Sequence, residues 1–203
     1  MTERRIYGRA RGPLGRVAEP FAARARRRRL EQFLERAGVG PETRIVDIGC
    51  GAFGLRASLP DFDITGVDRV ERPEYPGPFV RADATERLPF EDRQFDIAYA
   101  NSVIEHIPPA RRAAFAGELR RVARGWYVQT PALGFPIEPH ALLPAAHWLP
   151  RGVRRRYWAL GAGGDPDEVQ LLRRSEFERL FGPAMRERFG PLTKSWVCVR
   201  APR

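Results

Sequence analysis

Apolar and polar residues alternate along the chain with two different periods. Near the N-terminus, four apolar residues repeat at the i, i+3, i+4, i+7 spacing of one helix face: Leu30, Phe33, Leu34 and Ala37. Gly38 and Pro41 follow this stretch and are typical of the end of a helix. The pattern predicts a leading amphipathic helix that packs before the first strand.

Short runs rich in β-branched or aromatic residues come next, each ending at a polar or glycine-bearing turn: Arg44–Ile48, Ile64–Val67, Phe79–Ala82 and Phe95–Ala100. A helical stretch over residues 109–125 leads into a fifth strand-like run at 126–130. Strands that alternate with crossover segments predict a parallel, doubly wound α/β sheet. Ser175 and Glu178 have the spacing of a capping box and predict a helix start, and residues 184–202 predict a closing β-hairpin.

Two segments depart from a regular α/β pattern. The link between Asp68 and Phe79 contains three prolines and leaves no room for a crossover helix. Residues 131–166 are rich in Pro, Gly and aromatics and are too long for a plain loop, which predicts a substrate or lid insertion. We therefore divide the chain into a basic arm with the leading helix, residues 1–42, and one domain, residues 43–203, that carries this insertion.

The net charge of +10 is concentrated at the two ends of the chain. Residues 1–30 hold ten Arg against two Glu, residues 31–150 hold 13 basic and 17 acidic groups, and residues 151–203 hold 12 and 6. A basic arm of this kind suits contact with RNA or another anionic surface, and a solvated arm is the simpler alternative.

Bulk properties exclude several classes of protein. With 203 residues, the chain is too short for a dinucleotide-binding domain plus a separate catalytic domain. No apolar run approaches the roughly 20 residues that span a bilayer, and the N-terminus lacks the apolar stretch of a signal peptide. The two cysteines, Cys50 and Cys198, indicate neither a disulfide framework nor a zinc site. We expect a cytoplasmic protein without a transmembrane segment or a metal.

A glycine loop carries the clearest chemical signal. The stretch "RIVDIGCGAFG" ends in G-x-G-x-x-G, the spacing of a dinucleotide loop, and also contains D-x-G-x-G from Asp47. Such a turn brings backbone N–H groups close to a pyrophosphate, a carboxylate or a nucleoside. Asp47 would repel pyrophosphate and attract a cationic ligand. Asp68, 19 residues after Gly49, is placed to accept hydrogen bonds from ribose hydroxyls, whichever nucleoside carries them.

Further polar residues follow the third and fourth predicted strands. Asp83 comes at the end of the third strand, and Asn101 and Ser102 follow the fourth. Open α/β sheets bind ligands at the carboxyl ends of their strands. A carboxylate at position 83 can accept a hydrogen bond from an adenine amino group.

In this order, "VDIGCG", "GVD", "DATERLPFEDRQFDIAYANSVIEHIP" and "FAGELRRVARGWYVQTP" resemble a class I S-adenosylmethionine-dependent methyltransferase of the small, type 11-like kind. The resemblance covers residues 43–131. It implies a Rossmann-like, mostly parallel seven-stranded sheet with an antiparallel C-terminal strand, and S-adenosylmethionine as the cofactor. The family often has a third glycine where this chain has Phe53, and Gly54 comes one position later.

The same resemblance implies a set of cofactor-binding residues. Around the methionine part it places Asp47, Gly49 and Gly51, with Cys50 contributing its backbone. It places Asp68 at the ribose, Asp83 with Ala84 at the adenine, and Asn101 near the sulfonium and its amino acid tail.

Methyl transfer to a hydroxyl or an amine can require a general base, and the sequence has three histidines. His106, in "VIEHIP", and His140, directly after the fifth strand, are the candidates for a catalytic base. Glu138 is placed to orient His140, and the substrate candidates are Glu138, His140 and Trp148. The lid segment "RGVRRRYWAL" suits a phosphate, a nucleobase or a lipid interface, and a solvated face is the simpler alternative.

Together these features predict a methyltransferase that acts on a small molecule such as a sugar, a lipid-linked precursor or a secondary metabolite. An RNA methyltransferase that uses residues 1–30 is the alternative enzyme. A non-catalytic interaction domain with the same fold is a third hypothesis, and a nicotinamide oxidoreductase is the least supported.

Overall fold

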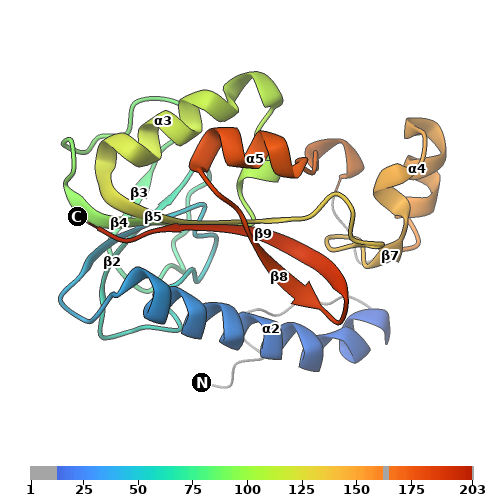
Figure 1. Cartoon of the computed structure of the whole chain (residues 1–203), viewed down its shortest axis with the longest axis horizontal. Coiled ribbons are helices and arrows are strands. Elements are labelled where there is room, and N and C mark those ends of the chain that lie inside the picture. Colours follow the sequence, from blue (N-terminus) through green and yellow to red (C-terminus); the bar gives the residue numbers. More distant parts are fainter. Residues whose placement is uncertain (1–12, 162–164, 203) are drawn as a thin grey trace.

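The computed structural model describes residues 13–161 and 165–202, and its centre is one seven-stranded sheet (Figure 1). The strand order is β3-β2-β1-β4-β5-β9-β8. β1 to β5 run parallel, while β9 is antiparallel to both β5 and β8. This confirms the predicted doubly wound sheet with its C-terminal hairpin. The strand bounds are β1 (Arg44–Ile48), β2 (Asp63–Asp68), β3 (Phe79–Arg81), β4 (Phe95–Asn101), β5 (Ala123–Pro131), β8 (Met185–Phe189) and β9 (Leu192–Arg200).

Helices cover both faces of the sheet (Figure 1). On one face lies α2 (Pro13–Ala37), and on the other lie α3 (Arg112–Val122) and α5 (Arg174–Phe181). Each face has its own apolar core, one built with α3 and α5 and the other with α2. The layers are those of a three-layer α/β domain.

The apolar stripe of α2 packs on the sheet as predicted. Phe33 is fully buried, and its ring meets Tyr99 edge-on at 4.9 Å and Tyr127 at 5.3 Å between ring centroids. Burying such a ring contributes about 2–3 kcal/mol, with roughly 1 kcal/mol more from edge-to-face geometry. The arginine-rich part of α2 is therefore held at a fixed place beside the sheet.

Two helix boundaries differ from the sequence expectation. The helix expected over residues 109–125 ends at Val122, because Ala123 is already extended and pairs with Phe95 of β4. The predicted helix start at the capping-box spacing is confirmed to within one residue: α5 begins at Arg174, so Ser175 lies inside its first turn and does not cap it. At Ala123, strand pairing overrides the local helical signal.

The link between β2 and β3 has no helix in its described residues 69–78, as its prolines predicted. Tyr75 fills the space instead and is 7% exposed. Its ring packs so tightly over Gly66 of β2 that a Cβ there would lie 2.5 Å from Tyr75 Cζ. The link thus closes the sheet edge with one aromatic ring.

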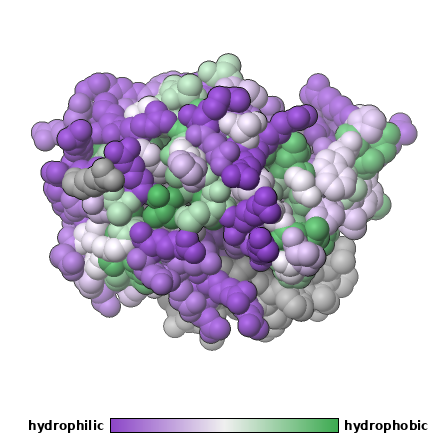
Figure 2. Space-filling view, in the orientation of Figure 1, coloured by the Kyte–Doolittle hydropathy of each residue, from purple (hydrophilic) through white to green (hydrophobic). Residues whose placement is uncertain are grey.

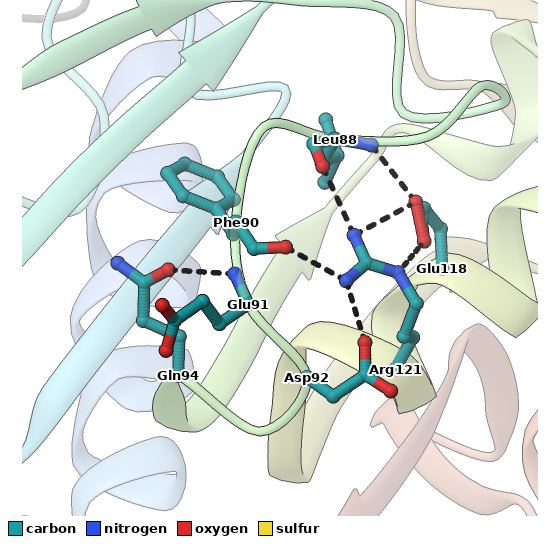
Figure 3. Close-up of polar contacts among 7 residues, drawn as sticks. All are labelled: Leu88, Phe90, Glu91, Asp92, Gln94, Glu118 and Arg121. Atoms are coloured by element: carbon teal, nitrogen blue, oxygen red, sulfur yellow. Dashed lines mark hydrogen bonds and ion pairs between the residues drawn. The ribbon is translucent and has the colours of Figure 1, made fainter.

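Arg121 of α3 braces the loop that leads into β4 (Figure 3). Its guanidinium donates to the carbonyls of Phe90 at 2.8 Å and Leu88 at 3.0 Å, and it forms ion pairs with Glu118 and Asp92. Glu118 in turn accepts the backbone N–H of Leu88 at 2.9 Å. This network fixes the chain between β3 and β4 against α3.

The segment after β5 forms a small subdomain at one end of the sheet (Figure 1). It contains β6 (Ile137–Glu138), β7 (Leu143–Pro144), the 3-10 turns η3 (Ala146–Trp148) and η4 (Pro166–Glu168), and α4 (Arg151–Trp158). Its own core consists of Ala141, Leu143, Ala146, Trp158 and Val169. Figure 2 shows a largely hydrophilic face with apolar patches near α4. In this region, Val153 of α4 and Leu160 just after it are 54% and 70% exposed. Over the described ranges, no helix combines the length and apolar character that crossing a membrane requires.

Candidate cofactor and acceptor site

The site lies where the order of the sheet reverses. From β1 the chain continues to β2 on one side, while β4 lies on the other side of β1. Ligands in open α/β sheets bind at this switch point, beyond the carboxyl ends of the strands. Asp47 and Gly49 at the end of β1, and Asn101 at the end of β4, meet there. The structure thus brings together the residues that the sequence placed around a cofactor.

The glycine loop is held in a left-handed conformation at three positions. Gly49, Gly51 and Gly54 have φ values of +71°, +60° and +53°, which glycine adopts without strain. The N–H groups of Gly49 and Cys50 both donate to the carbonyl of Val67, at 2.8 and 3.2 Å. The loop is therefore tied to β2.

Space around the loop differs from glycine to glycine. A Cβ on Gly49 would lie 2.5 Å from Val103 Cγ2, so this glycine is required by packing. A Cβ on Gly51 would have no described atom within 4 Å, which means that this position opens to a cavity. Gly51 is thus the point where a ligand can approach the backbone.

Asp47 is 3% exposed, and its Oδ2 accepts the backbone N–H of Leu55 at 2.6 Å. Burial raises the pKa of Asp47 to about 7, the Leu55 hydrogen bond acts in the opposite direction, and the nearby charge of Asp68 adds to the rise. A cationic group beside this carboxylate would restore its ionised form.

Asp68 connects the loop to the end of β2. Its Oδ2 accepts the N–H of Gly51 at 3.0 Å and pairs with Arg72 at 3.2 Å, while Oδ1 accepts the N–H of Val70 at 2.9 Å. The carboxylate is therefore fixed at the cavity edge, with part of its accepting capacity already used.

Two cavities meet at Gly49, which lines both. The first, of about 520 Å³, is lined on this side by Asp68, Asp83 and Ala84. The second, of about 590 Å³, is lined by Asp47, Cys50, Gly51, Phe53 and Asn101. The predicted nucleoside residues thus fall in one cavity and the predicted methionine residues in the other.

Asp83 lines the first cavity and Asn101 the second, and they differ in whether their oxygens already have hydrogen-bond partners. Asp83 Oδ1 accepts both the N–H and the hydroxyl of Thr85, at 2.8 and 2.6 Å, and Oδ2 pairs with Arg111 at 3.4 Å. Partial burial alone would raise the pKa of Asp83, but the Thr85 hydrogen bonds and the Arg111 charge hold it below its ordinary value. Asn101 Oδ1, by contrast, is buried and has no hydrogen-bond partner among the described residues. A buried acceptor of this kind calls for a donor from a ligand.

A second group of polar side chains borders the first cavity. Glu105 and His106 belong to the 3-10 turn η1 (Ile104–His106) and line this cavity, and His140 follows β6. The rings of His106 and His140 meet edge-on at 5.0 Å between centroids. His140 Nδ1 lies 2.7 Å from Glu138 Oε1, as predicted for an orienting carboxylate.

Burial and charge shift the pKa values in this group. Burial alone would lower the pKa of His140, but the Glu138 hydrogen bond and the charges of Glu138 and Glu105 raise it. Burial raises the pKa of Glu105, and His140 opposes that rise. Burial, with His140 nearby, lowers the pKa of His106.

Other predicted residues lie apart from the cavities. Trp148 Nε1 donates to the carbonyl of Leu133 at 2.9 Å, and His147 Nε2 lies 3.0 Å from the same oxygen. Trp148, Glu138 and His140 are not among the described residues that line the two cavities. Three arginines of α4 converge on the carboxylate of Asp167: Arg151, Arg154 and Arg155. These arginines are thereby engaged in holding α4 to η4.

The sequence reasoning missed two features. Arg26 and Arg29 of α2 line the second cavity, opposite Asp47, although they were interpreted as part of a basic arm. Glu105 is completely buried, and its Oε2 accepts the hydroxyl of Thr130 at 2.9 Å. The available signal was an acid inside the apolar run "SVIEHI", because a buried acid needs a specific partner.

The sheet order, the acid-bearing glycine loop at the switch point and the acid at the end of β2 have the arrangement that the resemblance to a class I S-adenosylmethionine-dependent methyltransferase implies, and the comparisons support this class. Residues 46–125 match the family model for a methyltransferase domain, and they include the glycine loop, Asp47, Asp68 and Asp83. A search of curated proteins found no match to the sequence.

Solved structures share the fold. The PH0226 protein of Pyrococcus horikoshii is 20% identical, with a TM-score of 0.58, over 88% of this chain and 91% of that one. The 1,6-didemethyltoxoflavin-N1-methyltransferase of Burkholderia thailandensis, solved with S-adenosylhomocysteine, is 14% identical, with a TM-score of 0.56, over 86% and 76%. The small RNA methyltransferase HEN1 is 17% identical, with a TM-score of 0.56, over 87% of this chain and 25% of that one.

Proposed function

We propose that the protein transfers a methyl group from S-adenosylmethionine to a small-molecule acceptor, and that the cofactor lies across Gly49. The nucleoside would occupy the first cavity and the amino acid tail the second. The observation that carries this proposal is the position of Gly49, which lines both cavities. The bound cofactor supplies an electrophilic methyl group, and the protein positions the acceptor and excludes water.

In the first cavity, Asp68 is the proposed partner of the ribose. Its two oxygens are held by backbone N–H groups, so a ribose hydroxyl would meet a carboxylate that is already oriented. Asp83 and Ala84 line the same cavity and are the proposed adenine contacts. Asp83 is turned toward Thr85, so we assign its adenine contact to the remaining lone pairs of its carboxylate.

Charges of both signs line the second cavity, where the amino acid tail would lie. Asp47 suits the cationic amino group, and Asn101 Oδ1 is a buried acceptor that lacks a described partner. Arg26, Arg27 and Arg29 of α2 line the same cavity and suit a carboxylate. Arg29 already forms an ion pair with Glu187 at 3.1 Å, so it would share its guanidinium between the two carboxylates. The backbone of Cys50 and Gly51 completes this wall.

On the acceptor side, the insertion at residues 131–166 would form the lid. A carbonyl oxygen can only accept, so His106 Nδ1, 3.2 Å from the Glu168 carbonyl, carries the proton. Glu138 Oε2 accepts two backbone N–H groups, and its Oε1 meets His140 Nδ1. In its neutral form, each imidazole therefore keeps an electron pair on Nε2, which is what a general base requires.

Calorimetry with S-adenosylhomocysteine and NAD tests the cofactor site. We expect S-adenosylhomocysteine to bind and NAD not to bind. Gly51→Ala should fold, with a strain cost of about 1 kcal/mol, and should bind S-adenosylhomocysteine at least about 10-fold more weakly because its Cβ would enter the cavity. Asp68→Ala should weaken binding as well. Equal heats with NAD, or full affinity in Gly51→Ala, would overturn the placement.

RNA is the second candidate acceptor, because the arginines of α2 continue onto an exposed face at Arg24 and Arg28. Transfer of a labelled methyl group to cell extract, separated into RNA, lipid and small-molecule fractions, distinguishes the two. We expect label in a small-molecule or lipid fraction, unchanged in a variant with Arg24→Glu and Arg28→Glu, because neither residue lines the second cavity. If the wild type labels the RNA fraction, the variant does not, and the labelling decreases steeply with salt concentration, RNA is the acceptor.

A further inference from the structure

We propose that Glu105, His106 and His140 form a binding site for a divalent transition-metal ion on the wall of the first cavity, with Glu138 as the carboxylate that orients His140. One ligand atom from each of the three residues lies within 4.8 Å of the others. Two imidazoles and one carboxylate are a ligand set suited to Zn²⁺, Mn²⁺, Fe²⁺ or Co²⁺.

The outer contacts of both histidines already have the arrangement that metal ligands need. Histidine ligands usually donate their second ring N–H to a carbonyl or a carboxylate. His106 Nδ1 faces the Glu168 carbonyl at 3.2 Å, and His140 Nδ1 faces Glu138 Oε1 at 2.7 Å. Each ring is thereby fixed in the tautomer that leaves Nε2 free to bind an ion.

Glu105 supplies the independent observation. Its side chain is completely buried, and Oε2 is satisfied by the Thr130 hydroxyl. Oε1 has no hydrogen-bond partner among the described residues, although it lies 3.9 Å from His140 Nε2. That distance is too long for a hydrogen bond. A buried carboxylate oxygen left in this way needs either a cation or a proton to balance it.

The distances also suit an ion. Two ligand atoms on one metal, each about 2.1 Å away, are separated by at most roughly 4.2 Å. The 3.9 Å between Glu105 Oε1 and His140 Nε2 falls inside this limit. The largest separation of 4.8 Å requires an approach of roughly 1 Å by the exposed ring of His106. The alternative to a metal ion in this cluster is a single proton, bound to His140 or to Glu105.

Three separate segments build the cluster, which explains why the sequence did not predict it. Glu105 and His106 come from η1, His140 from the turn between β6 and β7, and Glu168 from η4. The N–H of Gln170 donates to the Glu105 carbonyl at 2.8 Å and ties the last segment to the first. The expectation of no metal rested on the two cysteines and did not consider this set.

The site would narrow the class of acceptor, a consequence that rests on the proposed function. Glu105 and His106 line the same cavity as Asp83, so the ion would share this cavity with the nucleoside, and an acceptor that enters beside the nucleoside would meet the open positions of the ion. A divalent ion binds oxygen-bearing groups and lowers the pKa of a coordinated hydroxyl. An acceptor with a hydroxyl or carboxylate oxygen near the methylated atom fits best. Activation of the acceptor would then fall to the ion, because it would occupy the Nε2 electron pairs.

Titration with Co²⁺ tests the site on full-length protein that has no affinity tag and has been treated with a chelator. We expect one Co²⁺ per chain, with visible absorption bands, displaced by Zn²⁺. His106→Ala should weaken Co²⁺ binding about 100-fold or more, and Glu138→Gln about 10–100-fold. His147→Ala is the matched control, because this histidine contacts Leu133 outside the cluster, and it should bind Co²⁺ normally.

Binding of S-adenosylhomocysteine to the same variants separates this proposal from the proposed function. Glu138 is not among the residues that line either cavity, so Glu138→Gln should keep its affinity for S-adenosylhomocysteine while binding Co²⁺ more weakly. No Co²⁺ binding by the wild type, or equal Co²⁺ binding by wild type and His106→Ala, would overturn the metal site. If either occurs while S-adenosylhomocysteine still binds, a proton occupies the cluster and the methyltransferase proposal stands.

Discussion

Asp47 gives the sharpest prediction, because its environment couples cofactor binding to pH. The carboxylate is 3% exposed and accepts one backbone N–H, from Leu55. Burial raises its pKa to about 7. At pH 6, one unit lower, only about 10% of the protein without ligand carries charge at this position, and at pH 8 about 90% does.

The proposed site sets an ammonium group of the ligand against Asp47, and only the ionised form attracts it. The affinity for S-adenosylhomocysteine should therefore increase as pH rises from 5 to 7 and should level off near pH 8. The ionised fractions predict about 10-fold weaker binding at pH 6 than at pH 8, or about 1.4 kcal/mol. At pH 6 binding should release nearly one proton, and at pH 8 almost none.

Isothermal titration calorimetry at pH 6, 7 and 8, in pairs of buffers with different ionisation enthalpies, measures the affinity and the protons released. Asp47→Asn is the matched control, because its amide oxygen can still accept the Leu55 N–H while the charge is lost. This variant should bind more weakly, with little dependence on pH. If wild-type affinity is constant from pH 6 to 8, or if Asp47→Asn shows the same slope, the linkage argument is wrong.

The same pKa has a consequence for folding. The ordinary pKa of Asp47 is 3.8 and its folded value is about 7, so the folded state binds the extra proton between pH 4 and 7. The contribution of Asp47 to stability is therefore greatest at low pH and decreases as pH rises to 7, by at most about 4 kcal/mol. Without ligand, Asp47→Asn should gain stability relative to wild type between pH 5 and 8, as measured by urea denaturation. A difference that does not change with pH would contradict the assignment.

Three further substitutions, each measured by urea denaturation, test the loop before β4, the turn at Gly54 and the exposed face of α3. Arg121→Lys loses the planar fork that holds the loop before β4 and should lower the free energy of unfolding by about 1–3 kcal/mol. Gly54→Ala should cost about 3 kcal/mol, because its Cβ would lie 2.4 Å from Asp47 Oδ2 at a positive φ. Gly117→Ala, on the exposed face of α3, should gain about 0.5–1 kcal/mol, because a Cβ there would have no described atom within 4 Å. A free energy of unfolding equal to that of the wild type would contradict the prediction for the variant that shows it.

Local patterns were sufficient to predict the sheet and the cofactor side of the site. Asp47 lies in the strand before Gly49, and Asp68 lies at the end of the next strand along the chain. Because the two strands are parallel neighbours, both residues come to the same edge of the sheet. The stripe that includes Phe33 predicted the packing of α2, because one helix face is determined by spacing alone.

The rest of the site depends on contacts between distant segments. Glu105 is buried beside His140 only because the β6–β7 turn folds back over η1, and no local period encodes this contact. The arginines of α2 face the second cavity because Phe33 fixes the rotation of the helix on the sheet. The sequence showed that these residues are basic. It could not show that their side chains face the cavity, because that depends on how α2 packs on the sheet.

The third glycine of the loop acquires a specific role from this geometry. Gly54, which completes the G-x-G-x-x-G spacing, lets the chain turn directly over Asp47, since a Cβ there would meet Asp47 Oδ2 at 2.4 Å and the Tyr75 ring at 2.9 Å. The turn buries the carboxylate and brings the Leu55 N–H to it. Phe53 lines the second cavity beside it. A glycine at position 54 is therefore required by the close approach of the turn to Asp47, and burial of this carboxylate raises its pKa to about 7 against the opposing effect of the Leu55 hydrogen bond.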